Sequence, residues 1–265
     1  MCIFTVQMLQ RLLWIVLVLI VSNSCVKDPA LKKPDTPPAD TSRYIQFKFN
    51  ARCSGKNLLC NSNSWYTNLQ GDSFTVLKFQ YFISNITFIK NDGTSLTLAN
   101  EYHLLKHQIN KTQFTLQQAT KGSYTAVEFL IGVDSLRNIS GAQSGDLDPG
   151  NDMFWDWTTG YIFYKLEGQY KNSATQPARE YAVHIGGFQG RYSCLRKVRV
   201  LFNSILEINK PGITQIIFNV DVDELFKTPY SIGFDDYYNA VTLPMFQNLS
   251  YNYSDMFSVN EIISP

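Results

Sequence analysis

Apolar and polar residues alternate with a period of two from Tyr44 onward. In the segment 44–49, Ile45, Phe47 and Phe49 fall on one face and more polar residues on the other. Because successive side chains of a strand point to opposite sides of a sheet, this period predicts half-buried β-strands. The predicted strands cover residues 44–49, 74–83, 86–89, 95–98, 124–133, 161–166, 181–185, 197–202 and 214–220.

The segments between the predicted strands carry turn residues, and helical signals are scant. The run Asn91-Asp92-Gly93 is typical of a hairpin turn, and an acidic residue precedes one or two predicted helical turns at 221–226. Many short strands without intervening amphipathic helices favour an antiparallel arrangement. Residues 44–265 are therefore predicted to be all-β, as an antiparallel two-sheet β-sandwich with long loops and at most short helices.

Residues 1–24 are predicted to be a signal peptide. Arg11 supplies a positive charge, and the apolar run 12–21 is too short to span a bilayer, which takes about 20 residues. Small and polar residues then lead to Cys25 in a sequence that resembles a bacterial lipobox, with Ser22 in place of the usual Leu. Cys25 is therefore predicted to be lipidated. The alternative is an ordinary signal peptide that leaves Cys25 as a free thiol.

The segment 25–43, from the lipidated cysteine to the first strand, is predicted to be a flexible, Pro-rich tether. It contains four prolines and no apolar periodicity, which is typical of an extended, solvated chain. We expect a protein of the bacterial cell envelope that a lipid anchors to a membrane, with the outer membrane favoured. A periplasmic and a surface-exposed domain both stay open, since a single acidic residue closely follows Cys25.

The composition limits the partners and the chemistry. Lys and Arg total 23 against 22 Asp and Glu, which leaves a formal net charge of +1. Proteins that bind nucleic acid through its phosphates carry a basic surface, so a nucleic-acid partner is not expected. No G-x-S-x-G, H-E-x-x-H, G-x-G-x-x-G or P-loop sequence occurs, and we expect no enzymatic activity.

The cysteines of the domain suggest one disulfide. Cys53 and Cys60 lie seven residues apart around the turn-forming segment 54–57, and an exported protein meets an oxidising compartment. We predict a disulfide between them, which leaves Cys194 as the odd cysteine. No C-x-x-C pair occurs, so a zinc-ribbon site is not predicted.

A long loop rich in oxygen-bearing side chains spans residues 134–152. It contains four Asp and two Asn together with three Gly and one Pro. Since Ca²⁺ takes roughly six to eight oxygen ligands, the loop is a candidate calcium site, although acidic loops also cap turns and face water. The candidate ligands are Asp134, Asn138, Asp146, Asp148 and Asp152.

Two of the four tryptophans, Trp155 and Trp157, directly follow this loop. Because they are two residues apart, they share one face if the segment is extended. From this spacing alone, the simpler interpretation is a pair of aromatic side chains that pack beneath the loop.

Six short motifs occur in a fixed order along the chain. They lie at residues 81–86, 131–138, 145–149, 153–161, 166–168 and 184–188. The two most informative read Met153-Phe154-Trp155-Asp156-Trp157 and His184-Ile185-Gly186-Gly187-Phe188. In this order the motifs resemble the MbnP-like copper-binding protein family, and in particular its lipoprotein branch in Bacteroidetes. The resemblance covers most of the mature chain.

The resemblance implies a secreted or periplasmic protein that binds copper. In characterised relatives, histidine imidazoles and a tryptophan oxidised to kynurenine hold the metal, and the oxidation is attributed to a partner di-haem peroxidase of the MauG type. Carried over to this chain, His184 is a copper ligand, and Trp155 or Trp157 is the oxidised residue. The resemblance therefore predicts an exported, lipid-anchored protein with a role in copper acquisition or handling.

A second imidazole near the tryptophans is missing from these motifs. Because Cu(I) favours soft ligands, the thioethers of Met153 and Met256 are predicted to complete the site. The alternative for His184 is a hydrogen-bonded structural histidine. His103 and His107 stand about 13 Å apart on an extended strand, too far to share one metal without a bend.

A β-sandwich that binds no copper is the competing interpretation. Trp65, Tyr66, Trp155 and Trp157 could form a stacking platform, and such a module would bind glycan or another protein through exposed aromatic side chains. Exposed tryptophans beside the acidic loop would favour the glycan interpretation. Tryptophans buried beside His184 would favour copper.

Overall fold

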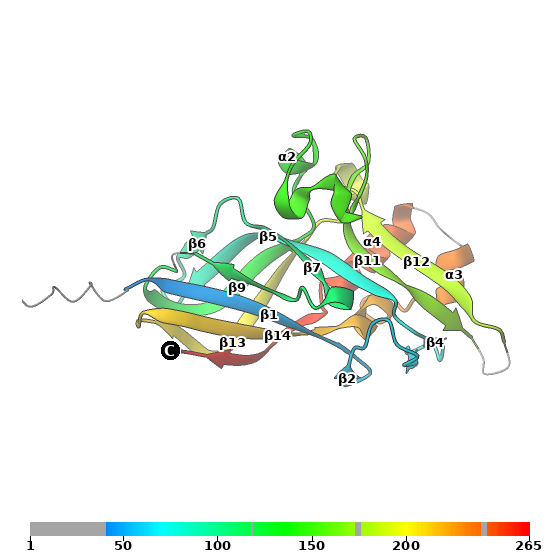
Figure 1. Cartoon of the computed structure of the whole chain (residues 1–265), viewed down its shortest axis with the longest axis horizontal. Coiled ribbons are helices and arrows are strands. Elements are labelled where there is room, and N and C mark those ends of the chain that lie inside the picture. Colours follow the sequence, from blue (N-terminus) through cyan, green and yellow to red (C-terminus); the bar gives the residue numbers. More distant parts are fainter. Residues whose placement is uncertain (1–40, 118, 173–175, 240–242) are drawn as a thin grey trace, which may run out of the picture. The chain divides into compact units, whose positions relative to one another are not determined.

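Figure 1 shows the computed structural model of the chain, in which two β-sheets pack against each other. This arrangement confirms the predicted all-β sandwich. The predicted signal peptide 1–24, the lipidation site Cys25 and nearly all of the tether 25–43 lie outside the described residues. The structure describes residues 41–265 except 118, 173–175 and 240–242.

The smaller sheet has two long neighbouring strands that run in the same direction. β1 (Arg43–Cys53) pairs with β14 (Gly212–Asp221) in parallel, with Arg43 opposite Gly212 and Arg52 opposite Asp221. This pair is an exception to the predicted antiparallel arrangement. A parallel pair needs a long crossover, and the chain between these two strands forms the whole of the other sheet. The remaining strands are β2 (Lys56–Asn57), β8 (Gln113–Leu116) and β15 (Phe257–Ile263).

The larger sheet is built on three long antiparallel strands. β5 (Lys78–Lys90) lies between β9 (Gly122–Ile131) and β11 (Gly160–Lys171). The predicted hairpin turn is confirmed, because β6 (Ser95–Thr97) returns antiparallel to β5. The remaining strands are β3 (Tyr66–Thr67), β4 (Ser73–Phe74), β7 (Tyr102–Lys106), β10 (Phe154–Asp156), β12 (Arg179–Gly186) and β13 (Arg196–Ile208).

The predicted strand 74–83 is divided in the structure. β4 ends at Phe74, and β5 begins only at Lys78. Between them the backbone N–H of Thr75 donates to the carbonyl of Gln169 over 2.8 Å, and that of Leu77 to the carbonyl of Glu167 over 2.7 Å. The three residues therefore follow the edge of β11, a change of partner that the apolar pattern does not reveal.

Aromatic rings fill the space between the two sheets. Phe47 of β1 meets Phe88 of β5 at a ring separation of 5.9 Å, and Phe218 of β14 meets Phe129 of β9 at 6.2 Å. Phe49 stacks on Phe218 at 5.0 Å within the smaller sheet. All these rings are buried, and edge-to-face pairs of this kind add to the stabilisation that burial of their area provides. The inward positions of the alternating pattern thus build the core.

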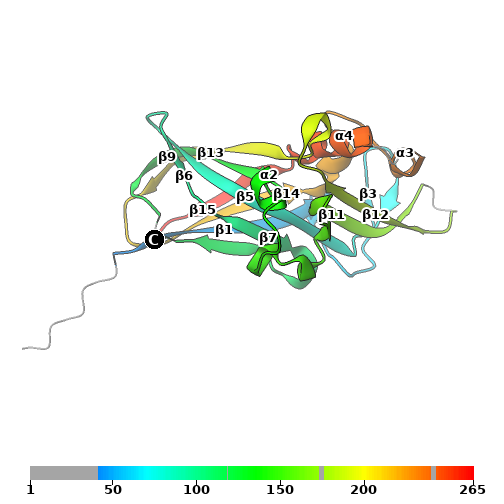
Figure 2. The same ribbon diagram turned by 90° about the horizontal axis from the view of Figure 1, so that it is seen from above.

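Helices occupy the connections, as Figures 1 and 2 show. A ridge of short helices over residues 134–151 rises from the larger sheet, and α3 and α4 lie beside the far end of β12. No helix in the described part of the chain is long and apolar enough to cross a membrane. The α-helices are α2 (Ser135–Asn138), α3 (Phe234–Asn239) and α4 (Leu243–Tyr253). The 3₁₀ helices are η1 (His107–Ile109), η2 (Gly145–Leu147), η3 (Pro149–Asn151), η4 (Gly190–Tyr192) and η5 (Val222–Phe226).

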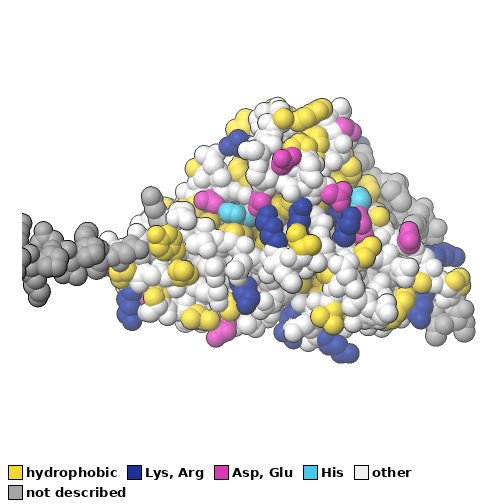
Figure 3. All heavy atoms as spheres, viewed as in Figure 1, with side chains coloured by type: hydrophobic (Ala, Val, Ile, Leu, Met, Phe, Trp, Pro, Cys, Tyr) yellow, Lys and Arg dark blue, Asp and Glu magenta, His cyan; other side chains and the backbone are white. Residues whose placement is uncertain are grey.

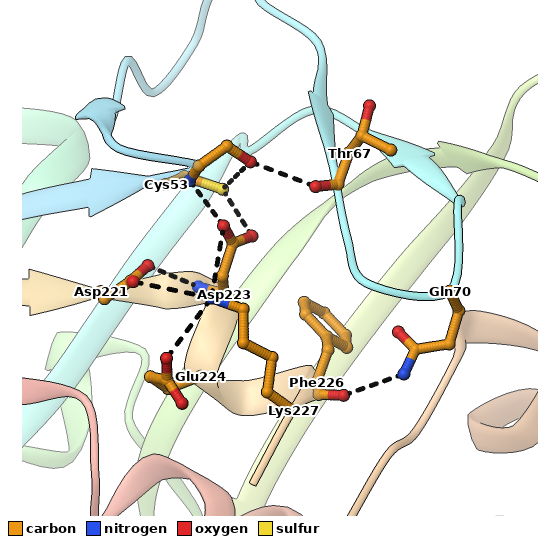
Figure 4. A network of polar contacts seen from close by, with 9 residues as sticks. Cys53, Thr67, Gln70, Asp221, Asp223, Glu224, Phe226 and Lys227 are labelled. Carbon is orange, nitrogen blue, oxygen red and sulfur yellow. Dashed lines mark hydrogen bonds and ion pairs between the residues drawn. The ribbon is translucent and has the colours of Figure 1, made fainter.

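A buried carboxylate connects the end of β1 to η5 (Figure 4). The Cys53 thiol donates to Oδ1 of Asp223 over 3.1 Å, and the backbone N–H of Ser54 donates to Oδ2 of the same carboxylate. Lys227 lies 3.8 Å from this carboxylate, and Asp221 caps η5 by accepting from the Asp223 N–H. The acidic cap predicted at 221–226 is therefore confirmed, although the helix is 3₁₀.

The same contacts correct the predicted disulfide between Cys53 and Cys60. Both are free thiols in the structure, and so is Cys194. Cys53 is buried at the C-terminal end of β1, where its thiol donates a hydrogen bond to Asp223. Cys60 instead lies opposite Val76 in an isolated bridge. Closeness in sequence therefore did not predict the partner of Cys53. The pairing of β1 with β14 places Cys53 beside η5, which directly follows β14.

Candidate functional site

His184 lies on the outer face of the β11–β12 hairpin. On β12 it alternates with Val183 and Ile185, which are buried in the core. The hairpin register places His184 opposite Lys165. The Lys165 side chain is almost completely buried, with 3% of it exposed. In Figure 3, histidine, acidic and basic side chains gather in a band across the middle of this side of the molecule.

The His184 ring is held by a carboxylate on the neighbouring strand. Its Nε2 lies 2.7 Å from Oε1 of Glu167. Because a carboxylate accepts, Nε2–H donates and the lone pair belongs to Nδ1. No described residue makes a hydrogen bond to Nδ1. This is the arrangement of metal-binding histidines, in which a carboxylate fixes the tautomer and the opposite nitrogen faces the metal.

Two lysines and one aspartate complete the polar cluster around Glu167. Lys78 lies 3.4 Å from Glu167 and 3.1 Å from Asp152. Lys165 lies 3.0 Å from the Asp152 carboxylate and also donates to its backbone carbonyl. The charges of the lysines are thus matched within the cluster.

The His184 imidazole favours its neutral form. Burial lowers the pKa of His184 below its usual value, and the positive charge of Lys165 lowers it further. The hydrogen bond to Glu167 raises this pKa and only partly offsets the burial. A neutral ring with an available Nδ1 lone pair is the form that binds a metal ion.

The Trp155 indole of β10 packs on Gly186, which lies two residues beyond His184 on β12. A Cβ added to Gly186 would lie 2.5 Å from Cζ3 of the Trp155 indole, so the ring rests directly on that glycine. Gly186 and His184 share one side of β12 because side chains alternate along a strand. The indole remains 41% exposed. Trp155 therefore lies between the two outcomes expected from the sequence: it packs on Gly186, two residues from His184 along β12, and is still open to solvent.

Trp157 does not join Trp155. β10 ends at Asp156, whose carboxylate accepts from the backbone N–H groups of Thr158 and Thr159 and so forms a turn. The Trp157 ring packs edge-on against Phe154 at 4.8 Å and is 60% exposed. The segment is therefore not extended through both tryptophans, and the condition under which their indoles would share one face is not met.

The two predicted thioether ligands are both buried. Met153 follows Asp152, and its carbonyl accepts from the Ile162 N–H beneath the ridge. The carbonyl of Met256 accepts from Asp221 at the end of the smaller sheet, and the next residue, Phe257, packs among the core aromatics. Met256 thus belongs to the interior, whereas His184 faces outward, so the structure does not bring these two predicted ligands together.

The other two histidines are engaged elsewhere. The Nε2–H of His103 donates to the Glu101 carboxylate over 2.7 Å, and the ring stacks on Phe114 with ring centroids 3.6 Å apart. His107 stacks against two neighbouring rings of β5, at 4.7 Å from Phe79 and 5.6 Å from Tyr81. Burial lowers the pKa of His107 to about 3. Both are structural histidines, as their spacing predicts.

The donor set around His184 fits a metal that needs few protein ligands. Within the described residues there is no group of three or more His, Cys, Asp and Glu side chains that could hold a metal ion. Zinc in structural sites takes four such ligands, and calcium takes more oxygens than this face offers. One imidazole nitrogen beside an indole suits a soft, monovalent ion such as Cu(I), which imidazole binds well.

The first part of the acidic loop is used for local hydrogen bonds. Asp134 caps α2 by accepting from the Arg137 N–H and also accepts from the Tyr102 hydroxyl. The buried Asn138 donates to the carbonyl of Val133 and accepts from the N–H of Tyr161. These two predicted calcium ligands therefore hold the base of the ridge.

The later residues of the loop have separate partners as well. Asp146 accepts from the Leu104 N–H and pairs with Lys111. Asp148 caps η3 by accepting from the Gly150 N–H, and Asp152 belongs to the cluster around Glu167. The structure thus corrects the predicted calcium site: the loop works as a set of caps and ion pairs.

Glu167 and the two lysines beside it are the residues that sequence reasoning did not assign. Glu167 stands in the short motif 166–168, but no local pattern links it to His184, which is seventeen residues away. The alternating pattern of β11 could have placed Lys165 and Glu167 on one face. Their partner on that face depends on the hairpin register.

Comparison with known proteins finds one matching family and one similar solved structure. A family model described as MbnP matches residues 42–243, a range that includes His184, Glu167 and Trp155. Among solved structures, MbnP from Methylosinus trichosporium is similar to this chain, with a TM-score of 0.48 and 15% sequence identity. That similarity covers 72% of this chain and 80% of the other. No curated protein matches the chain.

Proposed function

The chain belongs to the MbnP family, and from this premise we propose that it is an exported, lipid-anchored protein that binds copper on the outer face of the β11–β12 hairpin. The observation that carries the proposal is the pairing of His184 with Glu167 beside Trp155. The neutral imidazole offers Nδ1 to the metal, and Glu167 keeps the ring in that orientation. The family's association with copper supplies the identity of the metal.

The Trp155 indole has a defined part in this proposal. It rests on Gly186 and is partly exposed, so it can cover an ion held by His184 on the same side of the strand. The negative face of an indole attracts a cation within about 6 Å of its centre. Trp155 is therefore the tryptophan assigned to the site, and Trp157 lies beyond the turn.

Trp155 is also the candidate for oxidation to kynurenine by a MauG-type di-haem peroxidase. Two molecules of hydrogen peroxide convert tryptophan to kynurenine, formate and water, so that the indole loses one carbon and gains one oxygen. Its exposure supports access for such a partner. Mass spectrometry of the peptide that contains Trp155 tests this step after coexpression with the peroxidase. An unchanged mass in that peptide would remove the modification from the proposal.

Export and anchoring through Cys25 belong to the same proposal, which assigns the protein a binding role in copper acquisition or handling and no catalysis. A Cys25→Ser variant is expected to move from the membrane fraction to the soluble fraction of the cell envelope. If the variant stays in the membrane fraction, the anchor lies elsewhere.

A Cu(I) titration against a chromophoric chelator tests the metal site directly. His184→Gln retains an N–H donor for Glu167 and lacks the ring nitrogen, so it is expected to abolish binding while the fold is kept. His103→Gln is the matched control, because His103 also pairs with a carboxylate but belongs to another part of the sheet. Unchanged copper stoichiometry in His184→Gln would overturn the assignment.

A further inference from the structure

A groove of about 660 Å³ runs along the outer face of the same hairpin, on the side of Glu167 away from Lys165. The register places Glu167 opposite Ala182 and Gln169 opposite Glu180, and these outward side chains form one wall. The segment 61–65 lines the other side. This volume is within the usual range for a small-molecule site.

Hydrogen-bonded backbone forms the floor of the groove. The N–H groups of Thr75 and Leu77 already donate to the carbonyls of Gln169 and Glu167. At Gly168 a Cβ would lie 2.0 Å from the carbonyl oxygen of Thr75, so only glycine allows the chains to approach this closely. Because these strand edges are paired, the floor offers no ladder to an added peptide strand. Recognition has to come from side chains.

Trp65 presents a large aromatic surface at the groove. It lines the groove and is 41% exposed, whereas the next residue, Tyr66, is buried with its hydroxyl bonded to Leu59 and Asn57. The Lys171 ammonium lies 4.6 Å from the centre of the indole and restrains the ring. An exposed tryptophan that is held in place by its neighbours is ready to stack against a ligand.

Planar polar side chains accompany this ring. Asn63, Gln169 and Glu180 line the groove and are exposed. The amides of Asn63 and Gln169 make no side-chain hydrogen bond to any described residue. A sugar ring has an apolar C–H face that stacks on an indole, and neighbouring hydroxyls that bond in pairs to amides and carboxylates. The groove offers both kinds of partner together.

We propose that this groove binds an oligosaccharide, with Trp65 stacked against one sugar ring and the Asn63 and Gln169 amides bonded to its hydroxyls. The site is separate from the proposed copper ligand, because Trp65 and Gln169 take no part in the contacts of His184. The two sites share Glu167, which lines the groove and bonds His184. A saccharide in the groove therefore comes within reach of the carboxylate that orients the imidazole.

Titration calorimetry with hexasaccharides of glucose, xylose, mannose and N-acetylglucosamine tests the proposal on the purified full chain. At least one of them is expected to bind, and Trp65→Ala is expected to weaken that binding by about tenfold or more. Trp157→Ala is the matched control, because Trp157 is exposed but lies on the turn after β10. Gln169→Ala provides a second variant, with a smaller expected loss.

Three outcomes would overturn the proposal. They are no binding of any of the four hexasaccharides, equal affinity in wild type and folded Trp65→Ala, and displacement of the bound sugar by an unstructured peptide at similar concentration. Copper titration of the same Trp65→Ala protein is expected to match wild type. The two proposals therefore fail independently.

Discussion

The imidazole of His184 and the carboxylate of Glu167 meet across the β11–β12 hairpin, with Nε2 of one 2.7 Å from Oε1 of the other. Glu167 stands opposite Ala182 in the ladder, so the contact reaches diagonally along one face of the hairpin. The contact orients the ring so that Nδ1 is available, and the proposed copper affinity depends on it.

Replacement of Glu167 by Gln is expected to lower the affinity for Cu(I) by about 10- to 100-fold. The amide has the same size but lacks the charge that makes the imidazole a better ligand. Chelator competition measures the change. Glu180→Gln serves as the control, because Glu180 lies on the same face opposite Gln169. Equal affinities in Glu167→Gln and wild type would show that the carboxylate does not orient the ligand.

His107 is expected to make the domain less stable in acid. Burial lowers its pKa from 6.5 to about 3, so the folded state prefers the neutral ring, whereas the unfolded chain takes up a proton near pH 6.5. The stabilisation is therefore complete above pH 6.5 and decreases as the pH falls toward 3, by a few kcal/mol. Urea unfolding between pH 7 and pH 4 measures this change.

A His107→Phe variant keeps an aromatic ring against Phe79 and Tyr81 without a titrating group. Its unfolding free energy is expected to depend less on pH than that of wild type. The remaining dependence reflects His103 and His184, because burial lowers the pKa of both. Near pH 4 it also reflects Asp152, whose pKa burial raises but Lys165 and Lys78 lower overall. Identical pH profiles in the two proteins would contradict the assignment to His107.

Gly186→Ala is expected to displace the Trp155 indole. The added methyl group would lie 2.5 Å from Cζ3 of the ring and 2.6 Å from the carbonyl oxygen of Tyr161. Overpacking of this kind costs about 1–3 kcal/mol and forces the side chain to move. We expect a shift in tryptophan fluorescence together with weaker copper binding. Gly150→Ala, where the nearest atom would lie 3.2 Å away, should show neither effect.

Asp223→Ala is expected to reduce the unfolding free energy by about 2–4 kcal/mol. The substitution leaves the buried Cys53 thiol and the Ser54 N–H without their acceptor. Asp221→Ala removes the cap of η5 and a partly exposed ion pair with Lys227, and is expected to cost about 1 kcal/mol. Urea unfolding of both variants measures the difference. Equal losses would show that the buried carboxylate does not tie β1 to η5.

Burial also raises the pKa of the Cys53 thiol, and the Asp223 carboxylate raises it further. The reactive thiolate is therefore strongly disfavoured in the folded protein. The two cysteines are close in sequence, but the Cys53 thiol is kept in its protonated form and hydrogen-bonded to Asp223. The thiol serves Asp223 as a hydrogen-bond donor.

The alternating pattern was sufficient to predict the sandwich because burial repeats every two residues along a strand, a property of the local sequence. It could not predict that β1 pairs with β14 in parallel, since Arg43 and Gly212 are brought together by packing across the whole domain. It also missed the bend at residues 75–77. There, hydrogen bonds to β11 replace continuation of the strand.

The composition of the loop 134–152 suggested calcium ligands because it gives the number of side-chain oxygen atoms. It does not show whether these atoms point toward one place. In the folded chain each of these side chains has its own hydrogen-bond or ion-pair partner. Asp134 accepts from the Arg137 N–H, and Asp146 pairs with Lys111. Carboxylates that accept such bonds at separate points cannot converge on one ion. The loop composition therefore describes a well-capped ridge.

The linear chain was enough to reveal the family and most of the strands, and to single out His184 and the two neighbouring tryptophans as candidates, because motifs and alternation are both written in neighbouring residues. The sequence did not reveal the partner of His184, because that partner depends on which residue of β11 lies beside His184 in the sheet. A slip of one position would turn Glu167 to the opposite side of the sheet. The register, including the irregularity between Ile162 and Tyr164, results from core packing and strand pairing together.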